Sequence, residues 1–114
     1  MLFRSSDPAD TALLARRFPN VRVIMAHLTG CGFRGVIEVK ALDNLVVDTS
    51  GGQPEAGLIE HAVEHLGAGR VLHGSDLPIR DPACTIGRIL CSAISDEAKE
   101  QILFGNSRRF FGLP

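Results

Sequence analysis

The chain contains no tryptophan and no tyrosine, and phenylalanine supplies all of its 5% aromatic content. Without a series of such rings, a stacking platform for nucleic acid bases is not expected. Lysine and arginine number 12 against 13 aspartates and glutamates, a formal net charge of −1. That balance gives no electrostatic reason for nucleic acid or an anionic membrane as partner. No apolar run approaches the length of a membrane span, and residues 1–6 do not read as a signal peptide.

Cysteine is also scarce, with Cys31, Cys84 and Cys91 as the three examples. An odd number without a close pairing motif predicts reduced thiols and a cytoplasmic protein. Cys84 and Cys91 are seven residues apart, so on one continuous helix they share a face, and we expect both to pack in the core. At 114 residues, the chain is long enough for one core but too short for a complete (β/α)₈ barrel of roughly 200–250 residues.

What the chain does have is an alternation of short apolar runs and helical patterns. Strands are predicted at residues 1–4, 21–26, 45–48 and 71–74. Helices are predicted at residues 9–18, 35–42, 54–66 and 81–94, with a further helix capped by Ser95 and ended by Gly105. Strands that alternate with helices favour a parallel sheet, which we expect to carry its helices on one side.

Two of the predicted strands end on side chains that can bind a metal. Residues 70–78 (RVLHGSDLP) deliver Asp76, and residues 21–26 lead directly to His27. Catalytic groups of α/β barrels are presented at strand ends in this way. The alternative is two ordinary strand ends, with His27 a packed core or loop histidine and Asp76 a turn cap. Asp48 and Ser50 end the strand at 45–48, where they either face the same site or form a strand-end turn.

Four segments, in this order, resemble the C-terminal part of the amidohydrolase-related family of metal-dependent TIM-barrel hydrolases and decarboxylases. They are residues 18–27 (FPNVRVIMAH), 44–51 (NLVVDTSG), 70–78 (RVLHGSDLP) and 102–111 (ILFGNSRRFF). The resemblance implies an α/β fold that is a partial (β/α)₈ barrel, comprising roughly strands five to eight with their helices. Residues 1–114 would then form a single C-terminal half-barrel whose N-terminal half is missing. The start of the chain inside an apparent strand suggests an incomplete gene or a late start.

The same resemblance implies the site residues. Asp76 matches the eighth-strand aspartate that binds the divalent metal and helps to activate water, and His27 matches the sixth-strand histidine, a metal ligand or general acid/base. The expected metal is zinc, with manganese as the alternative. Its ligand set is incomplete here, because the family's His-x-His on the first strand is absent. Arg4 stands where the family usually has a ligand histidine; because arginine cannot bind a metal, it is expected to hold a substrate carboxylate instead. Ser50 is the second expected substrate contact.

A separate motif, residues 61–65 (HAVEH), has the spacing of an inverted zinc-protease motif. His61 and His65 are four apart on a predicted helix, so they can ligate one ion together. That helix follows the seventh barrel strand, however, and should lie on the outer ring. A solvated helix face therefore explains these histidines better than a catalytic zinc site.

Two classes of function remain open. The first is the C-terminal portion of a metal-dependent hydrolase or decarboxylase (a carbon–carbon lyase) that acts on a small, carboxylate-bearing substrate; the isolated chain is expected to be inactive. The second is a non-catalytic half-barrel that is structural, or that associates with itself or with a missing N-terminal half. An incomplete parallel barrel favours such association because it leaves open strand edges and an exposed apolar interior.

Overall fold

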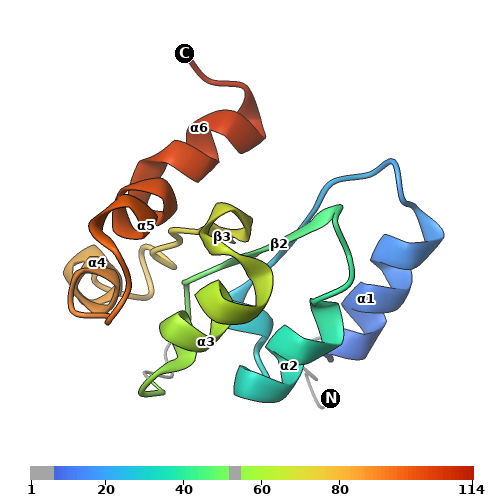
Figure 1. The fold of residues 1–114 in the computed structure, drawn as a ribbon, viewed down its shortest axis with the longest axis horizontal. Helices are drawn as coiled ribbons and strands as arrows, with labels where there is room; N and C mark the ends of the chain where they lie inside the picture. The colour runs from blue at the N-terminus through green and yellow to red at the C-terminus, as the bar shows by residue number, and fades with distance from the viewer. Residues whose placement is uncertain (1–6, 52–54) are drawn as a thin grey trace.

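The computed structural model describes residues 7–51 and 55–114. The described part contains the strands β1 (Val23–Met25), β2 (Leu45–Asp48) and β3 (Val71–Leu72). Its α-helices are α1 (Pro8–Arg17), α2 (Gly32–Val39), α3 (Leu58–Leu66), α4 (Pro82–Leu90), α5 (Asp96–Glu100) and α6 (Asn106–Phe111). Short 3₁₀ turns η1 (His27–Thr29) and η2 (Ala68–Arg70) and a π turn η3 (Gln101–Gly105) complete it. In Figure 1, α1, α2 and α3 lie together, and α4, α5 and α6 form a second group.

The strands form one parallel sheet in chain order, β1-β2-β3. The predicted parallel β/α alternation is therefore confirmed for three of the four expected strands. The fourth, predicted at residues 1–4, lies outside the described residues. None of the helices in the described part is both long enough and apolar enough to cross a membrane.

The core lies mainly between one face of the sheet and the helices α1, α2 and α3, and Ile89 of α4 and Ile102 of η3 join it. It includes Leu45 and Val47 of β2, Ala12 and Ala15 of α1, Val36 and Val39 of α2, and Ile59 and Ala62 of α3. The other face of the sheet is less covered: Ile24 is 38% exposed, and its partner across the β1–β2 register, Val46, is only half-buried. A parallel sheet is normally buried on both faces, so this apolar face is one that a closed barrel would cover.

Side-chain caps begin two of the helices, whereas two helix bounds differ from those predicted. Asp7 accepts a hydrogen bond from the Ala9 N–H at the start of α1, and the Ser95 hydroxyl accepts one from the Ala98 N–H at the start of α5. The predicted start of the third helix at residue 54 is wrong, because Gly57 adopts a left-handed conformation (φ 78°) directly before α3. The helix predicted to reach residue 94 ends at Leu90.

Two further expectations are corrected. Gly105 does not end a helix: its φ of −60° is helical, and the chain runs from α5 through η3 into α6. Asn106, the first residue of α6, is buried, and its amide donates to the carbonyls of Ala68 and Val71, which holds α6 against β3. Cys84 and Cys91 are both exposed, because the inward face of α4 belongs to Thr85 and Ile89.

Arg70, at the end of η2, ties β3 to the end of α2. Its guanidinium donates to four backbone carbonyls at 2.7–3.0 Å, those of Val39, Lys40, Leu42 and Leu45. Partial burial lowers the pKa of Arg70, with the charge of Asp43 opposing that shift. Only a planar guanidinium presents enough fixed donors to reach all four oxygens at once.

We expect Arg70→Lys to lower the free energy of unfolding by about 2 kcal/mol, because a lysine ammonium cannot satisfy four carbonyls held in this arrangement. Urea denaturation measures the change. Arg16→Lys on the exposed surface of α1 is the matched control and should stay within about 0.5 kcal/mol of the parent chain. Equal stability of the two variants would contradict the anchoring role of Arg70.

Candidate active site

The carboxyl ends of the three strands meet at one edge of the sheet. β1 is followed by His27, β2 by Ser50, and β3 by the loop that contains Asp76. His27 Nε2 lies 4.0 Å from Asp76 Oδ1, although the two residues are 49 positions apart in the chain (76 − 27). A parallel sheet predicts that His27, Ser50 and Asp76 lie at this same edge, and the structure brings His27 and Asp76 together there.

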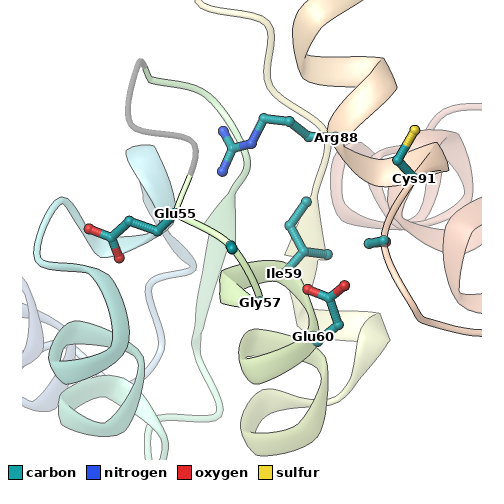
Figure 2. A pocket seen from close by; sticks show the side chains of 8 residues that line it. Glu55, Gly57, Ile59, Glu60, Arg88 and Cys91 are labelled. Carbon is teal, nitrogen blue, oxygen red and sulfur yellow. The ribbon is translucent and has the colours of Figure 1, made fainter.

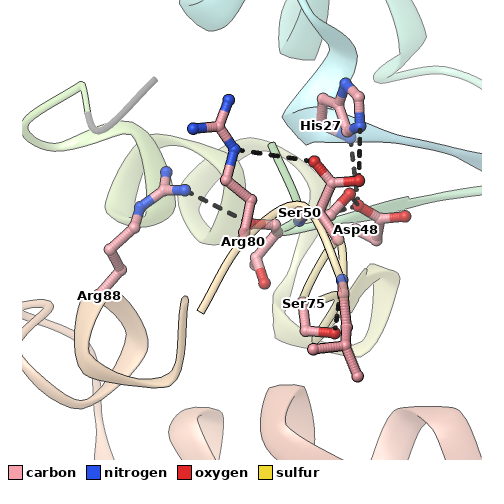
Figure 3. A network of polar contacts seen from close by, with 9 residues as sticks. His27, Asp48, Ser50, Ser75, Arg80 and Arg88 are labelled. Carbon is pink, nitrogen blue, oxygen red and sulfur yellow. Dashed lines mark hydrogen bonds and ion pairs between the residues drawn. The ribbon is translucent and has the colours of Figure 1, made fainter. Parts of the chain in front are cut away.

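Asp48 organises the loops at this edge (Figure 3). Its Oδ1 accepts a hydrogen bond from the His27 backbone N–H at 3.1 Å and one from the Ser50 backbone N–H at 2.9 Å. The Ser50 hydroxyl donates to the same oxygen. The last residue of β2 thus fixes the start of η1 and the turn after β2. The sequence alone left Asp48 undecided between a site residue and a turn residue.

Two glycines permit the close approach of these loops. A Cβ at Gly51 would lie 3.0 Å from the Cβ and Cγ of His27. A Cβ at Gly74 would lie 3.0 Å from Asp48 Cγ and Oδ1 and from Ser50 Cβ. These are distances at which a neighbour must move, and the neighbours at Gly74 are held by the hydrogen bonds of Asp48.

Gly74→Ala should therefore displace Asp48 and lower the free energy of unfolding by about 1–3 kcal/mol, the usual cost of overpacking. Gly87→Ala is the matched control, because a Cβ at Gly87 in α4 meets nothing within 4 Å. In a helix interior, alanine should stabilise the chain by roughly 0.5–1 kcal/mol. Thermal or urea unfolding measures the stability of the two variants. A change in stability of the same sign in both would contradict the tight packing at Gly74.

His27 and Asp76 share an unusual backbone conformation. Their φ angles are 66° and 61°, in the left-handed region that side chains other than glycine seldom adopt. Such strain persists where the surrounding structure holds it, and it concentrates at active sites and ligand clamps. That both predicted metal-type residues show it, at one sheet edge, favours a functional site over two ordinary strand ends.

His73 lies beside this edge with a different environment. Its Nε2 is 3.2 Å from the Thr85 hydroxyl, and partial burial lowers its pKa, with the negative charge of Asp48 acting in the opposite direction. The lowered pKa favours the neutral imidazole form of His73. His73 packs the β3 loop onto α4 and is not the charged partner of Asp76.

Sequence reasoning missed two arginines at this edge. Arg80 Nε lies 3.9 Å from Asp76 Oδ2, and Arg88 donates from α4 to the Thr49 carbonyl at 3.3 Å (Figure 3). A signal for Arg80 existed, because it stands four residues after Asp76 and the loop between them is short. Nothing in the sequence points to Arg88, which the fold brings from the next helix. Arg4, an expected substrate contact, lies outside the described residues.

The residues of the HAVEH motif also come together, on α3. Possible ligand atoms of His61, Glu64 and His65 on α3 lie within 4.8 Å of one another. The His61 ring packs against Phe33 and His65, and its Nε2 is 3.2 Å from the Phe33 carbonyl. The two histidines are half-buried, so the expected fully solvated face is only partly correct.

A family model described as Amidohydrolase matches residues 1–113. The chain belongs to the amidohydrolase family. No curated protein matches it. Among solved structures, it is similar to amidohydrolase 2 from Bifidobacterium longum subsp. infantis, with a TM-score of 0.78 and 21% identity, over 100% of this chain and 49% of that one.

Two further solved structures share the fold. An amidohydrolase from Burkholderia multivorans with bound zinc has a TM-score of 0.78 at 18% identity, over 95% of this chain and 50% of that one. A dihydroxybenzoic acid decarboxylase from Polaromonas sp. JS666, with manganese and the inhibitor 2-nitroresorcinol, has a TM-score of 0.70 at 18% identity, over 92% and 40%. The chain thus spans half or less of the length of these structures, and its fold is part of a TIM barrel.

Proposed function

We propose that this chain is the C-terminal portion of a metal-dependent amidohydrolase that hydrolyses or decarboxylates a small molecule, with Asp76 and His27 at its centre. The observation that carries the proposal is the 4.0 Å approach of His27 Nε2 and Asp76 Oδ1, both on strained backbone at the carboxyl edge of the sheet. This edge is where TIM-barrel enzymes place their catalytic groups. The family membership of the chain supports the same assignment.

The donor set at this edge fits a divalent metal in part. Imidazole and carboxylate are suitable ligands for zinc or manganese, the ions named in the two related structures. A separation of 4.0 Å is close to what shared coordination requires, since zinc holds such ligands at about 2.0–2.2 Å. A catalytic zinc site uses three protein ligands, so the remaining ligands must come from barrel strands beyond those described. A bound metal would make a water molecule acidic enough to act as a nucleophile near neutral pH.

The residues of this chain have distinct tasks in that chemistry. The Asp76 carboxylate is only 24% exposed and faces His27, so it is placed to hold the metal and to accept a proton from the water. The His27 side chain is 49% exposed, so it can reach a substrate as general acid or base. Asp48 positions His27 by accepting a hydrogen bond from the His27 backbone N–H. Ser50, whose hydroxyl now donates to Asp48, and Arg4 remain the proposed substrate contacts.

Zinc titration by calorimetry tests the metal assignment. The 114-residue chain should bind zinc weakly at the sheet edge, because two donors are present where three are typical. The titration is done in the His61→Ala background, which removes the competing cluster on α3. Asp76→Asn should abolish the binding that remains. Tight one-to-one binding in the parent chain that His61→Ala removes and Asp76→Asn leaves unchanged would place the metal on α3 instead.

In this proposal, catalysis requires a segment that supplies barrel strands one to four and their His-x-His. This chain joined to such a segment, or co-expressed with it, is called the complemented protein below. Turnover on candidate carboxylate substrates, before and after metal removal by a chelator, tests the proposal. Turnover that survives complete removal of the metal would contradict it.

A second proposal is a non-catalytic half-barrel that pairs with itself or with an N-terminal half. The uncovered sheet face around Ile24 favours it. Analytical ultracentrifugation distinguishes the two proposals, because self-pairing through this face should be lost in Ile24→Lys, whereas metal binding at Asp76 should persist. The cytoplasm remains the proposed location, in keeping with three exposed, unpaired cysteines.

A further inference from the structure

A cavity of about 360 Å³ adjoins the carboxyl edge of the sheet. Its wall comes from the loop after β2, from the loop after Asp76 and from the first turns of α4. The residues that matter for its chemistry are Gly51, Ile79, Arg80, Cys84, Thr85 and Arg88. The volume is that of a small-molecule site, and the wall combines apolar surface with two guanidinium groups.

Both guanidiniums have donors to spare. Arg88 uses one N–H on the Thr49 carbonyl, and no carboxylate in residues 7–51 or 55–114 lies within ion-pair distance of it. Arg80 makes no side-chain hydrogen bond to the described part of the chain; its contact with Asp76 is a loose ion pair at 3.9 Å. Since each guanidinium carries five N–H donors, most of them remain available to a ligand.

The negative charges around the cavity are already engaged. Asp81, which also lines it, accepts the Ala83 N–H as the N-cap of α4. Asp76 faces His27 on its other side, at 4.0 Å. A ligand with one negative charge can therefore bind between Arg80 and Arg88 without displacing a strong internal salt bridge.

The neighbouring cavity on the other side of Arg88 has the opposite character (Figure 2). It measures about 320 Å³ and is lined by two carboxylates, Glu55 and Glu60, together with Ile59, Cys91 and Arg88 itself. Glu60 already accepts the Ala93 N–H at 2.7 Å. This cavity sets two carboxylates against the single guanidinium of Arg88, whereas the cavity beside the sheet edge sets two guanidiniums against the single carboxylate of Asp81. Of these two cavities, the one between Arg80 and Arg88 is therefore the anion site.

We propose that the cavity beside the sheet edge binds the carboxylate of a small organic acid, with Arg80 and Arg88 as its binding residues. The two guanidinium groups, each with N–H donors in one plane, suit the planar, two-oxygen geometry of a carboxylate. Ile79 and Cys84 supply apolar contacts for the body of the acid. The claim that this acid is the substrate of the enzyme rests on the proposed function. The claim that the cavity binds such an acid can be tested without catalysis.

The test is an NMR titration of the 114-residue chain with benzoate, with neutral benzamide as the isosteric control and inorganic phosphate as the competing anion. Benzoate should bind saturably and more tightly than either, with an affinity that falls as salt is added. Arg80→Gln and Arg88→Gln should each weaken benzoate binding about tenfold, the usual effect of losing a charged hydrogen bond. Arg16→Gln on α1 makes the same charge change away from the cavity and should have no effect. Urea denaturation confirms that each variant keeps its fold.

Benzamide binding as tightly as benzoate, phosphate binding more tightly than benzoate, or an unchanged benzoate affinity in both cavity variants would each overturn the inference. The Asp76→Asn variant separates it from the proposed function. This variant should bind benzoate at least as tightly, because it removes the carboxylate 3.9 Å from Arg80. Wild-type turnover of Asp76→Asn in the complemented protein would refute the proposed function and leave the carboxylate site standing. Unchanged benzoate affinity in both arginine variants, with turnover abolished by Asp76→Asn, would refute the carboxylate site and leave the proposed function standing.

Discussion

Asp76→Asn in the complemented protein is expected to remove nearly all turnover while leaving the fold intact. Asparagine keeps the shape of the side chain but removes the charge that, in the proposed function, holds the metal and accepts the proton of the water. General base catalysis alone is worth roughly 10²–10⁴-fold, and loss of the metal adds to it. The measurements are turnover and metal content by atomic emission.

The fold should survive this change for two reasons. The contacts of the Asp76 carboxylate, at 4.0 and 3.9 Å, are too long to contribute much stability. Asparagine also tolerates the positive φ of 61° at this position better than most residues. An Asp76→Asn protein that keeps both its metal and wild-type turnover would refute the assignment.

His27→Gly should reduce turnover by roughly 10²–10⁴-fold while removing less metal than Asp76→Asn does, if His27 is the general acid or base. Glycine is the cleanest deletion here, because it adopts a φ of 66° without strain and keeps the backbone N–H that bonds to Asp48. Added imidazole should restore part of the rate, since it can occupy the space of the missing ring.

Two outcomes would change the role of His27. Metal loss as complete as in Asp76→Asn, without rescue by imidazole, would make His27 a ligand. Unchanged turnover would remove it from the site. Leu13→Gly, at an exposed position of α1 away from this edge, is the control for the general effect of introducing glycine.

The strand ends could be predicted from the sequence because each depends on a local pattern. A short apolar run followed by glycine, proline or a polar residue predicted β1, β2 and β3 to within a few residues. The parallel order followed from the intervening helices, and parallel order places the strand ends at one edge. The approach of His27 to Asp76 was thus a consequence of topology, not of any pattern near either residue.

The side-chain hydrogen bonds that join one element to another could not be predicted, because they connect residues far apart in the chain. Asn44 donates to the carbonyls of Ala15, Phe18 and Val21, which fixes the end of α1 against β1. Arg70 and Asn106 do the same for α2 and α6. A hydrophilic residue beside a strand gives no sign of which distant carbonyl it will reach. For the same reason, the sequence gives no sign that Arg88, a half-exposed residue of α4, lies beside the sheet edge.

The positive φ angles of His27 and Asp76 have a consequence for how this chain can be redesigned. A procedure that optimises stability alone would choose glycine at both positions, because it relieves backbone strain of order 1 kcal/mol at each. The most stable sequence for this backbone would therefore be one without its imidazole and its carboxylate. Any thermostable version intended as a catalyst must hold these two positions fixed and take its gains elsewhere, beginning with Gly87 in α4.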